Sequence, residues 1–262
     1  MLTPFLFSTV EALVMALAVM TLIWAVTEWL QNSSLVDAAW SLTILALALH
    51  FAAQPEGFIP RDILTAALAA FWALRLSIFI FMRNHGKGED PRYADLKVKW
   101  GEKRKFKMLQ FFWAQGAAAA IFTLPFILTA ANTAHQIHAL EWAGALVVFA
   151  AVLGETSADI SLARFKANPA NRGKTCRAGL WNYSRHPNYF FEWLVWCGFA
   201  LLASSSPLGW LTWLCPAVML HFLLNVTGIP KTEEQALKSR GQDYRDYQRT
   251  TSKFVPWFKT RD

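Results

Sequence analysis

The sequence predicts an all-α integral membrane protein with seven transmembrane helices, an N-terminus outside and a C-terminus in the cytoplasm. Three observations support this fold class. Apolar runs of about 20 residues recur along the chain, which is the length that an α-helix needs to cross a bilayer. Of the 262 residues, 55% are hydrophobic and 16% are charged, whereas an average soluble domain has about 25% charged residues. The basic residues are also confined to a few segments, as expected of cytoplasmic loops.

The apolar runs define seven spans in a single membrane domain that covers residues 1–262. Each run is long and continuous, so a helix is the form that satisfies its backbone in lipid. No Lys or Arg precedes the first run, which therefore lacks the basic start of a secretory signal and is expected to be retained. The predicted spans are Val10–Leu30, Val36–Ala53, Ile63–Met82, Leu109–Ala131, Ala139–Phe165, Pro187–Ala203 and Leu208–Ile229.

The positions of the basic residues test this number of spans. Residues 83–107 carry nine Lys or Arg, residues 164–185 carry six and residues 231–261 carry eight, together 23 of the 25 in the chain. With seven spans and the N-terminus outside, all three segments fall on one side of the membrane. The positive-inside rule makes that side the cytoplasm. One span more or fewer would scatter the charge over both sides.

The net charge of +7 follows from the same arrangement. A basic rim against anionic lipid accounts for most of it. Because the basic residues are tied to the membrane face, the sequence argues against nucleic-acid binding. The three cysteines have no CxxC spacing, and no group of His, Glu and Asp has the spacing of a metal site, so we expect neither a disulfide framework nor a bound metal.

A polar turn over residues 179–192 leads directly into the sixth span. Pro187 suits the first turn of a helix, and the free N–H groups there, with Arg185 and His186, suit an anionic group such as phosphate. Asn188 and Glu192 are four residues apart, so they share one face of the helix at the depth of the membrane surface. The competing interpretation is an ordinary capped helix start, but a cap needs one such residue rather than five.

A second polar stripe lies near the cytoplasmic end of the fifth span. Glu155 and Asp159 share a helix face, and Arg164 and Lys166 follow them. Acids accept hydrogen bonds from sugar hydroxyls and basic residues bind phosphate, so the stripe suits a ligand that carries both. An internal ion-pair ladder, such as Asp159 with Arg164, explains the same residues equally well.

One basic residue, Arg75, lies well inside the third span and needs a counter-charge. Asp37 on the second span is the natural candidate. Such a pair would either hold the helices together or polarise a group in a cavity.

These motifs resemble the C-terminal half of the steroid 5-alpha-reductase family, in its bacterial and largely uncharacterised branch. The resemblance rests on Glu155 with Asp159, on Gly179-Leu180-Trp181, and on the segment Arg-His-Pro-Asn-Tyr-x-x-Glu-Trp-x-x-Trp that begins at Arg185. Further matches are Trp72-x-x-Arg75-Leu76, Gly88–Tyr93, Tyr244–Tyr247 and Phe254–Phe258. Membrane methyltransferases that act on isoprenyl-cysteine or phospholipids carry a similar Arg-His-Pro turn.

The resemblance implies a reductase of the bacterial inner membrane, with residues 1–131 around the substrate and residues 139–262 holding NADPH at the cytoplasmic face. In that family the Asn and Glu of the motif hold the nicotinamide end, which maps to Asn188 and Glu192. An acid on the preceding helix, here Asp159, holds the adenosine ribose. The implied cofactor-binding residues are Arg92, Tyr93, Glu155, Asp159, Lys166, Arg172, Lys174, Arg177, Asn182, Tyr183, Arg185, His186, Asn188, Tyr189, Glu192, Trp196, Tyr244 and Tyr247.

The implied reaction is hydride transfer from NADPH to the β-carbon of an enone in a steroid-like or isoprenoid lipid, which enters a lipid-facing cavity between the first four spans. In the family an acid or phenol polarises the substrate carbonyl. This sequence departs from the better-known members, because their Gln-Glu pair is not evident and Trp72 stands where a Tyr is expected. The expected catalytic residues are therefore Asp37 and Arg75, with Glu192 at the nicotinamide. The expected partners are the lipid or steroid substrate and membrane lipid, bound by a monomer.

Two other functions remain open from the sequence. An S-adenosylmethionine-dependent membrane methyltransferase would have a smaller cofactor pocket and no contacts to a 2′-phosphate. A non-catalytic lipid-binding or scaffold protein would tolerate alanine at Asp159, Asn188 and Glu192.

Overall fold

The computed structural model describes residues 2–54, 57–86 and 88–259. In this part of the chain every regular element is a helix, apart from an isolated parallel bridge between Ser184 and Ser252. Six helical stretches are long and apolar enough to cross a membrane, by length and composition: Leu2–Leu30, Ser33–Ala52, Ile59–Asn84, Pro91–Ala130, Ala139–Ala167 and Gly209–Arg240. The chain divides into two compact units, Met1–Trp142 with Leu202–Thr212 (unit 1) and Ala143–Leu201 with Trp213–Asp262 (unit 2).

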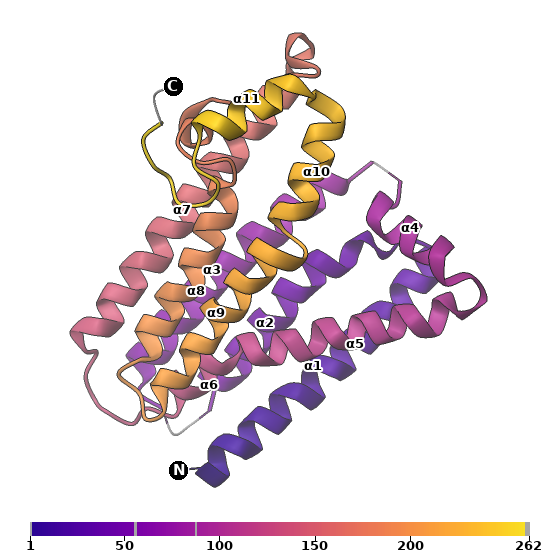
Figure 1. The fold of residues 1–262 in the computed structure, drawn as a ribbon. Coiled ribbons are helices and arrows are strands. Elements are labelled where there is room, and N and C mark those ends of the chain that lie inside the picture. The colour runs from indigo at the N-terminus through magenta and orange to yellow at the C-terminus, as the bar shows by residue number, and fades with distance from the viewer. Residues whose placement is uncertain (1, 55–56, 87, 260–262) are drawn as a thin grey trace. The chain divides into compact units, whose positions relative to one another are not determined.

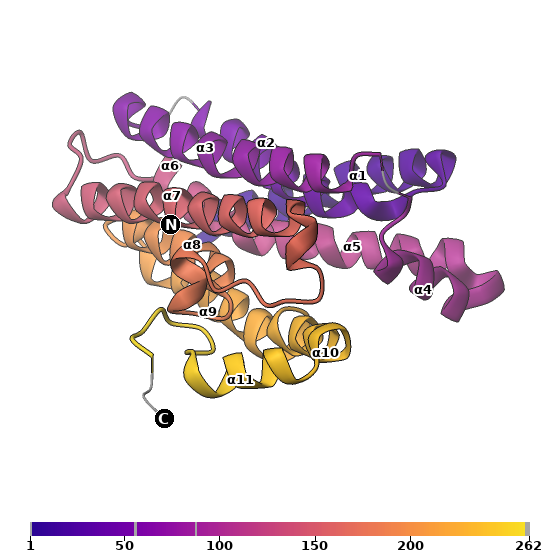
Figure 2. The ribbon, with the colours of Figure 1, turned by 90° about the horizontal axis from the view of Figure 1, so that it is seen from above.

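The α-helices of unit 1 in the described residues (Figure 1) are α1 (Leu2–Leu30), α2 (Val36–Ala52), α3 (Ile59–Asn84), α4 (Pro91–Trp100), α5 (Arg104–Phe122) and α6 (Leu124–Ala130). Unit 1 also contains the first residues of α7 (Ala139–Ala167). In unit 1, α2 packs against α3, and α1 packs against both α2 and α5. The short α4 contacts one end of α5, as Figures 1 and 2 show.

The ends of these helices follow from side-chain caps and from proline. The side chain of Asn32 accepts a hydrogen bond from the backbone N–H two residues later and so closes the turn between α1 and α2. Asp90 caps α4 in the same way. A break at Thr123 divides the predicted fourth span into α5 and α6, because Pro125 has no N–H to continue the helix.

A fully buried ion pair ties α3 to the start of α7 within unit 1. Arg61 and Glu141 both have no exposed surface. The Arg61 guanidinium donates to both carboxylate oxygens of Glu141. It also donates to the carbonyls of Asn132, Ala134 and Gln136 at 2.7, 2.9 and 2.6 Å. All five donors of the guanidinium are thereby matched, and the loop between α6 and α7 is fixed.

Unit 2 contains the rest of α7, followed by α8 (Pro187–Ala203), α9 (Leu214–His221), a π-helical stretch (Phe222–Val226), α10 (Ile229–Arg240) and α11 (Gln242–Thr250). Two glycines bring α7 and α8 together. A Cβ on Gly154 would lie 2.4 Å from the Phe191 ring, and one on Gly198 would lie 2.7 Å from Val148. Gly241, with a φ of 53°, lets the chain turn sharply from α10 into α11 (Figure 1).

The long helical stretches coincide with six of the seven predicted spans. The remaining span, Pro187–Ala203, forms α8 with those same bounds but has 17 residues, fewer than any of the six stretches. The all-helical fold with several stretches able to cross a membrane is therefore confirmed.

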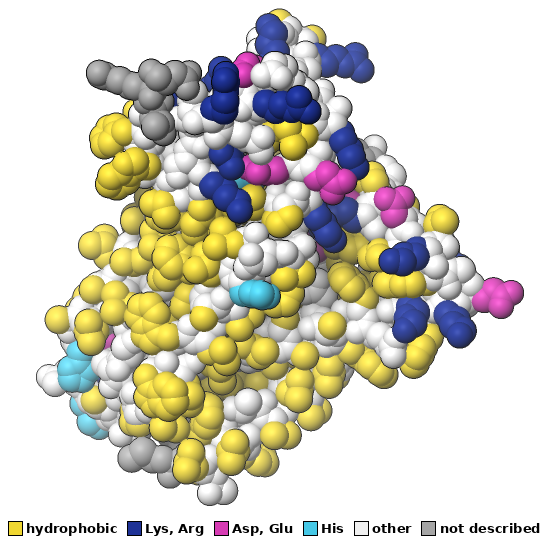
Figure 3. All heavy atoms as spheres, viewed as in Figure 1, with side chains coloured by type: hydrophobic (Ala, Val, Ile, Leu, Met, Phe, Trp, Pro, Cys, Tyr) yellow, Lys and Arg dark blue, Asp and Glu magenta, His cyan; other side chains and the backbone are white. Residues whose placement is uncertain are grey.

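Charged and apolar side chains are separated on the face drawn in Figure 3. In unit 2, Lys and Arg side chains gather over α10 and α11, and in unit 1 they gather over α4. Large apolar side chains are exposed on the outer faces of the long helices, among them Val14, Leu22, Ile78 and Leu146. An apolar outer face is what a helix in contact with lipid requires.

Candidate functional site

The polar turn before α8 is bound to the tail of the chain within unit 2. The Ser184 hydroxyl donates to the Phe254 carbonyl at 2.7 Å and accepts from the His186 N–H at 3.1 Å. The Arg185 N–H donates to the Ser252 carbonyl at 2.8 Å. Residues 184–186 and 252–254 therefore build this turn together.

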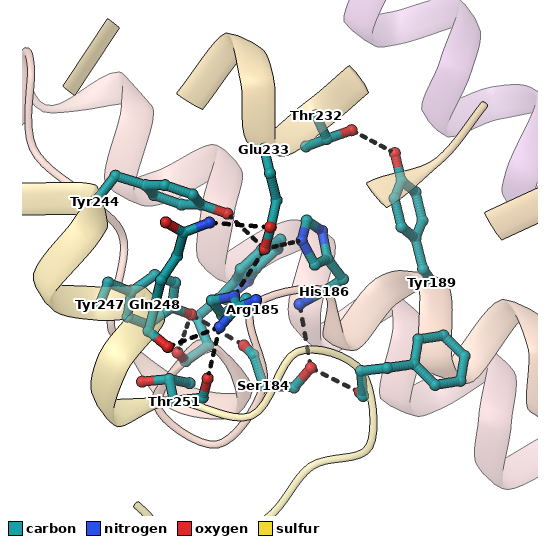
Figure 4. Close-up of polar contacts among 12 residues, drawn as sticks. Ser184, Arg185, His186, Tyr189, Thr232, Glu233, Tyr244, Tyr247, Gln248 and Thr251 are labelled. Atoms are coloured by element: carbon teal, nitrogen blue, oxygen red, sulfur yellow. Dashed lines mark hydrogen bonds and ion pairs between the residues drawn. The ribbon is translucent and has the colours of Figure 1, made fainter. Parts of the chain in front are cut away.

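Glu233 of α10 is the centre of the network (Figure 4). Its Oε1 accepts a hydrogen bond from Arg185 Nε at 2.7 Å and lies 3.2 Å from His186 Nε2. The same oxygen accepts from the Tyr244 hydroxyl at 3.3 Å, and Oε2 accepts from the Gln248 amide at 3.0 Å. One carboxylate thus joins α10, α11 and the turn before α8.

Arg185 and Tyr247 add hydrogen bonds to backbone carbonyls. The Arg185 guanidinium donates to the carbonyls of Gln248 and Thr251 at 2.8 and 3.1 Å. The Tyr247 hydroxyl donates to the Ser184 carbonyl at 3.0 Å. The last carbonyls of a helix have no partner within the helix, so Arg185 satisfies the end of α11.

Burial and charge give the members of this network different protonation states. Burial lowers the pKa of His186, although its hydrogen bond to Glu233 opposes the shift. Burial by itself would raise the pKa of Glu233, but the hydrogen bond from His186 and the charge of Arg185 outweigh it and lower that pKa to about 2. Glu233 lies beyond the predicted seventh span, Leu208–Ile229, in a part of α10 that is rich in charged residues. The ion pair is therefore Arg185 with Glu233, and His186 is a neutral donor.

Four residues that the sequence predicted at a cofactor have these partners within the chain: Arg185, His186, Tyr244 and Tyr247. Together they fasten α10 and α11 to the start of α8. The predicted free helix start is also covered in part, since the His186 N–H donates to a side chain. Glu233, an acid of the same chain, contacts both members of this Arg-His pair.

Three buried acids gather on α7 and α8. Glu155 and Asp159 are each 4% exposed and Glu192 is 9% exposed. The Asn188 amide donates to Asp159 Oδ1 at 3.4 Å, and Trp196 Nε1 donates to Glu192 Oε1 at 3.0 Å. Carboxylates accept hydrogen bonds from sugar hydroxyls, and an amide can both donate and accept. The structure thus brings together the polar stripe predicted on the fifth span and the one predicted on the sixth.

The basic residues in the last turn of α7 and in the loop after it are exposed. Lys166, Arg172 and Lys174 all lie at the surface. Arg164 is exposed as well, and among the described residues it forms no ion pair, so the alternative ladder of Asp159 with Arg164 is not formed. Arg172 and Lys174 are therefore available to a ligand from solution.

The other predicted residues of unit 2 lie around the same turn. Arg177 donates to the Asp243 carboxylate at 2.9 Å. The Tyr189 hydroxyl lies 3.1 Å from the hydroxyl of a threonine in α10 (Figure 4). Asn182 ends a short 3-10 turn, and Tyr183 is exposed. Arg177 and Tyr189 thus support the tail, as the Glu233 network does.

A separate cluster in unit 1 contains Asp37, Arg92 and Tyr93. The Tyr93 hydroxyl donates to Asp37 Oδ1 at 2.6 Å, and the Arg92 guanidinium donates to Oδ2 at 2.8 Å. The Arg75 guanidinium lies over the Phe79 ring, 5.4 Å from its centroid. Asp37 is therefore paired with Arg92 and Tyr93, and the predicted pairing of Asp37 with Arg75 is wrong.

Sequence reasoning missed Glu233, Gln248 and Ser184. Each is an ordinary polar residue outside the apolar runs. Ser184 lies in the predicted polar turn but was given no role, and Glu233 and Gln248 belong to no motif that the sequence analysis used. One signal was present, because a buried Arg beside a His needs an acid, and residues 231–261 contain four acids in all. The sequence does not indicate which of the four it is.

Unit 1 also has an apolar groove of about 470 Å³ between three helices. It is lined by Ile23, Val26 and Thr27 of α1, by Leu35 and by Ala38, Ala39 and Leu42 of α2, and by Leu74, Ser77, Ile78 and Phe81 of α3. The groove agrees with the predicted lipid-facing cavity in its apolar character, but the fourth predicted span contributes none of the lining residues.

The helices, their apolar outer faces and the polar networks together define a multi-pass helical membrane protein. The chain belongs to the family described as protein of unknown function DUF1295, whose model matches residues 23–251. It is similar to Uncharacterized protein C594.04c of Schizosaccharomyces pombe, with 26% identity over 283 aligned residues that cover 94% of this chain and 79% of the relative. No solved structure matches the chain.

Proposed function

We propose that this protein is an NADPH-dependent reductase of a conjugated C=C bond in a steroid-like or isoprenoid lipid. One observation supports this above all: the carboxyl groups of Glu155, Asp159 and Glu192 are buried with the Asn188 amide on two closely packed helices. Ionisable groups within apolar helices are costly and are usually functional. A single polar contact is enough to join two helices. Three buried acids are more than this contact between α7 and α8 requires, and they therefore favour a polar ligand.

The residues of unit 2 fit a nicotinamide dinucleotide in its sugar and amide parts. Glu155 and Asp159 would accept hydrogen bonds from ribose hydroxyls. Asn188 and Glu192 would hold the carboxamide, because an amide of the ligand needs both a donor and an acceptor.

Exposed cations supply the phosphate contacts in this proposal. Arg172 and Lys174 lie at the surface in the loop after α7, and basic side chains of this kind bind phosphate. Arg185 and His186 do not belong to this set, because Glu233 already holds both.

When bound, NADPH would supply the hydride for the β-carbon of an enone. The chain would orient the nicotinamide and exclude water from it, through the buried acids and the Asn188 amide. In unit 1, Asp37 and Arg75 remain the proposed catalytic residues. The Tyr93 hydroxyl, 2.6 Å from Asp37, keeps that carboxylate in a fixed orientation.

The topology proposed with this function has seven spans, with the N-terminus outside and the basic segments in the cytoplasm of a bacterial inner membrane. The 17 residues of α8 lie at the short end of the range of about 17–25 residues for transmembrane helices.

Ligand-dependent thermal unfolding of the purified protein tests the cofactor. All three cysteines lie in unit 2, and Cys176 and Cys215 are buried, so their reaction with a thiol probe reports when this unit opens. NADPH at about 100 times its dissociation constant should add about 2.7 kcal/mol to the stability. Stabilisation by S-adenosylmethionine without a response to NADPH would instead support a methyltransferase. No response to either ligand would favour a non-catalytic lipid-binding protein.

A matched pair of variants tests the nicotinamide assignment. Glu192→Gln removes a buried charge, and we expect it to abolish most of the stabilisation by NADPH while the protein stays folded. Glu234→Gln makes the same chemical change on an exposed side chain of α10 and should bind NADPH normally. Equal binding by both variants would exclude Glu192 from the cofactor site.

A further inference from the structure

The apolar groove of unit 1 occupies one end of α1, α2 and α3. Its lining residues come from the last turns of α1 and α3 and from the first turns of α2. All three helices are among those long and apolar enough to cross a membrane. On its rim, Val26, Leu42 and Ile78 are 49%, 43% and 56% exposed. The groove therefore opens on a surface that a membrane would cover with lipid.

The floor of the groove is made of small side chains. Ala38, Ala39 and Ser77 are all buried there. Residues of ordinary core size at these positions would fill the space between the helices. The volume of about 470 Å³ lies within the range of about 300–1,000 Å³ for ligand sites.

The groove offers no free hydrogen-bond donor from its side chains. Two of the eleven lining residues have hydroxyl groups, and both hydroxyls are engaged. The Thr27 hydroxyl donates to the Trp24 carbonyl at 2.9 Å. The Ser77 hydroxyl lies 2.7 Å from that of Ser41, which donates to the Ala38 carbonyl at 2.9 Å. An occupant would therefore meet hydrocarbon and no charge.

We propose that this groove binds a single hydrocarbon chain, acyl or isoprenyl, from a lipid of the surrounding leaflet. The inference rests on the proposed function only in that it narrows the substrate class. An enone needs a donor for its carbonyl, and the groove supplies none, so the chain lies in the groove and the reactive group lies outside it. A rigid ring ketone held within the groove would bury its oxygen without a partner, which is unfavourable.

Photo-crosslinking tests this proposal without any cofactor. The purified protein in detergent is incubated with palmitic acid that carries a diazirine near its methyl end, and the labelled peptides are mapped by mass spectrometry. We expect the label on residues 23–42 and 74–81. Competition by phosphatidylglycerol or by geranylgeraniol should lower the labelling at least fivefold, and the better competitor distinguishes an acyl from an isoprenyl source. Progesterone at the same concentration should leave it unchanged. The proposal would be overturned if all lipid-facing helices were labelled to the same extent. It would also be overturned if progesterone displaced the probe at least as effectively as phosphatidylglycerol or geranylgeraniol.

Variants that fill the groove give an independent result. Ala39→Phe places a ring on the floor, and Ile78→Trp places one on the exposed rim, where folding is not at risk. Both should lower the labelling at least fivefold. Leu49→Phe is the matched control, because Leu49 is exposed on α2 and does not line the groove. Labelling at the wild-type level in folded Ile78→Trp would overturn the proposal. Either result leaves the NADPH measurement unaffected, so the two proposals fail separately.

Discussion

The buried Arg61–Glu141 pair gives the sharpest prediction for stability. Arg61→Ala removes a guanidinium that donates five hydrogen bonds. It leaves the Glu141 carboxylate without its counter-charge at a position with no exposed surface. It also leaves three backbone carbonyls of the loop between α6 and α7 without their donor.

The size of the effect follows from this burial. Breaking a buried ion pair by removing one partner costs about 3–5 kcal/mol, because the remaining charge stays buried. We therefore expect Arg61→Ala to lower the free energy of unfolding of unit 1 by about 4 kcal/mol. For a domain of 150–250 residues, this corresponds to a fall in melting temperature of about 8–16 °C.

Thermal unfolding of the protein in detergent, followed by circular dichroism at 222 nm, measures the loss. Arg61→Lys keeps the charge but not the planar fork of donors, so its melting temperature should lie between those of the wild type and Arg61→Ala. Replacing both partners, by Arg61→Met with Glu141→Leu, should recover part of the stability, because no lone charge remains, although the three carbonyls still lack their donor. Lys105→Ala, on an exposed side chain of α5, should stay within about 0.5 kcal/mol of the wild type. A melting temperature of Arg61→Ala within 2 °C of the wild type would refute the reasoning.

Three further predictions concern unit 2. Glu233→Ala leaves Arg185 and His186 without their shared acceptor and should destabilise the tail by about 3 kcal/mol. This loss should be seen as faster proteolysis over residues 241–259. An unchanged rate of proteolysis would contradict the prediction. The tail should also become less stable in acid. The pKa of His186 is below its usual 6.5 in the folded protein, so the contribution of His186 to stability is present above pH 6.5 and is lost below it. Glu233 has a folded pKa of about 2 against 4.5, so its contribution to stability is lost between pH 4.5 and 2. Proteolysis that does not rise below pH 6.5 would count against this. Gly154→Ala puts a Cβ 2.4 Å from the Phe191 ring and should lower the free energy of unfolding by about 1–3 kcal/mol. Adding Phe191→Leu should restore part of this loss. A melting curve equal to that of the wild type would show that α7 and α8 move apart at no cost.

The apolar pattern was sufficient to predict the positions of the helices. The bounds of α8 were predicted without error, because Pro187 marks its start and an apolar run marks its length. The third span was predicted to begin at Ile63, but α3 begins at Ile59. Arg61 therefore lies outside the predicted span but inside α3. Its partner Glu141 lies 80 positions later in the chain, and no local pattern reveals such a pair.

In the candidate site too, local contacts were predicted from the sequence and contacts between distant residues were not. Spacing alone brought Glu155 to Asp159 and Asn188 to Glu192, because residues four apart share a helix face. It did not place Arg185, whose acceptors Glu233 and the carbonyls near residue 250 come from the far end of the chain. Asp37 likewise meets Tyr93 across 56 positions. Contacts of this range depend on how the helices pack, and a single sequence does not specify that.

The parallel bridge between Ser184 and Ser252 has a consequence for biosynthesis. Arg185 contacts the carbonyl of Thr251, which lies 66 positions later in the chain. Arg185 therefore leaves the ribosome well before this acceptor has been synthesised. Unit 1 similarly awaits residues 202–212. Until Glu233 and the carbonyls of Gln248 and Thr251 have been synthesised, the Arg185 cation lacks these acceptors. A chain that stops before residue 248 would lack both carbonyl acceptors of Arg185, and we expect proteases to cleave it faster near the turn before α8.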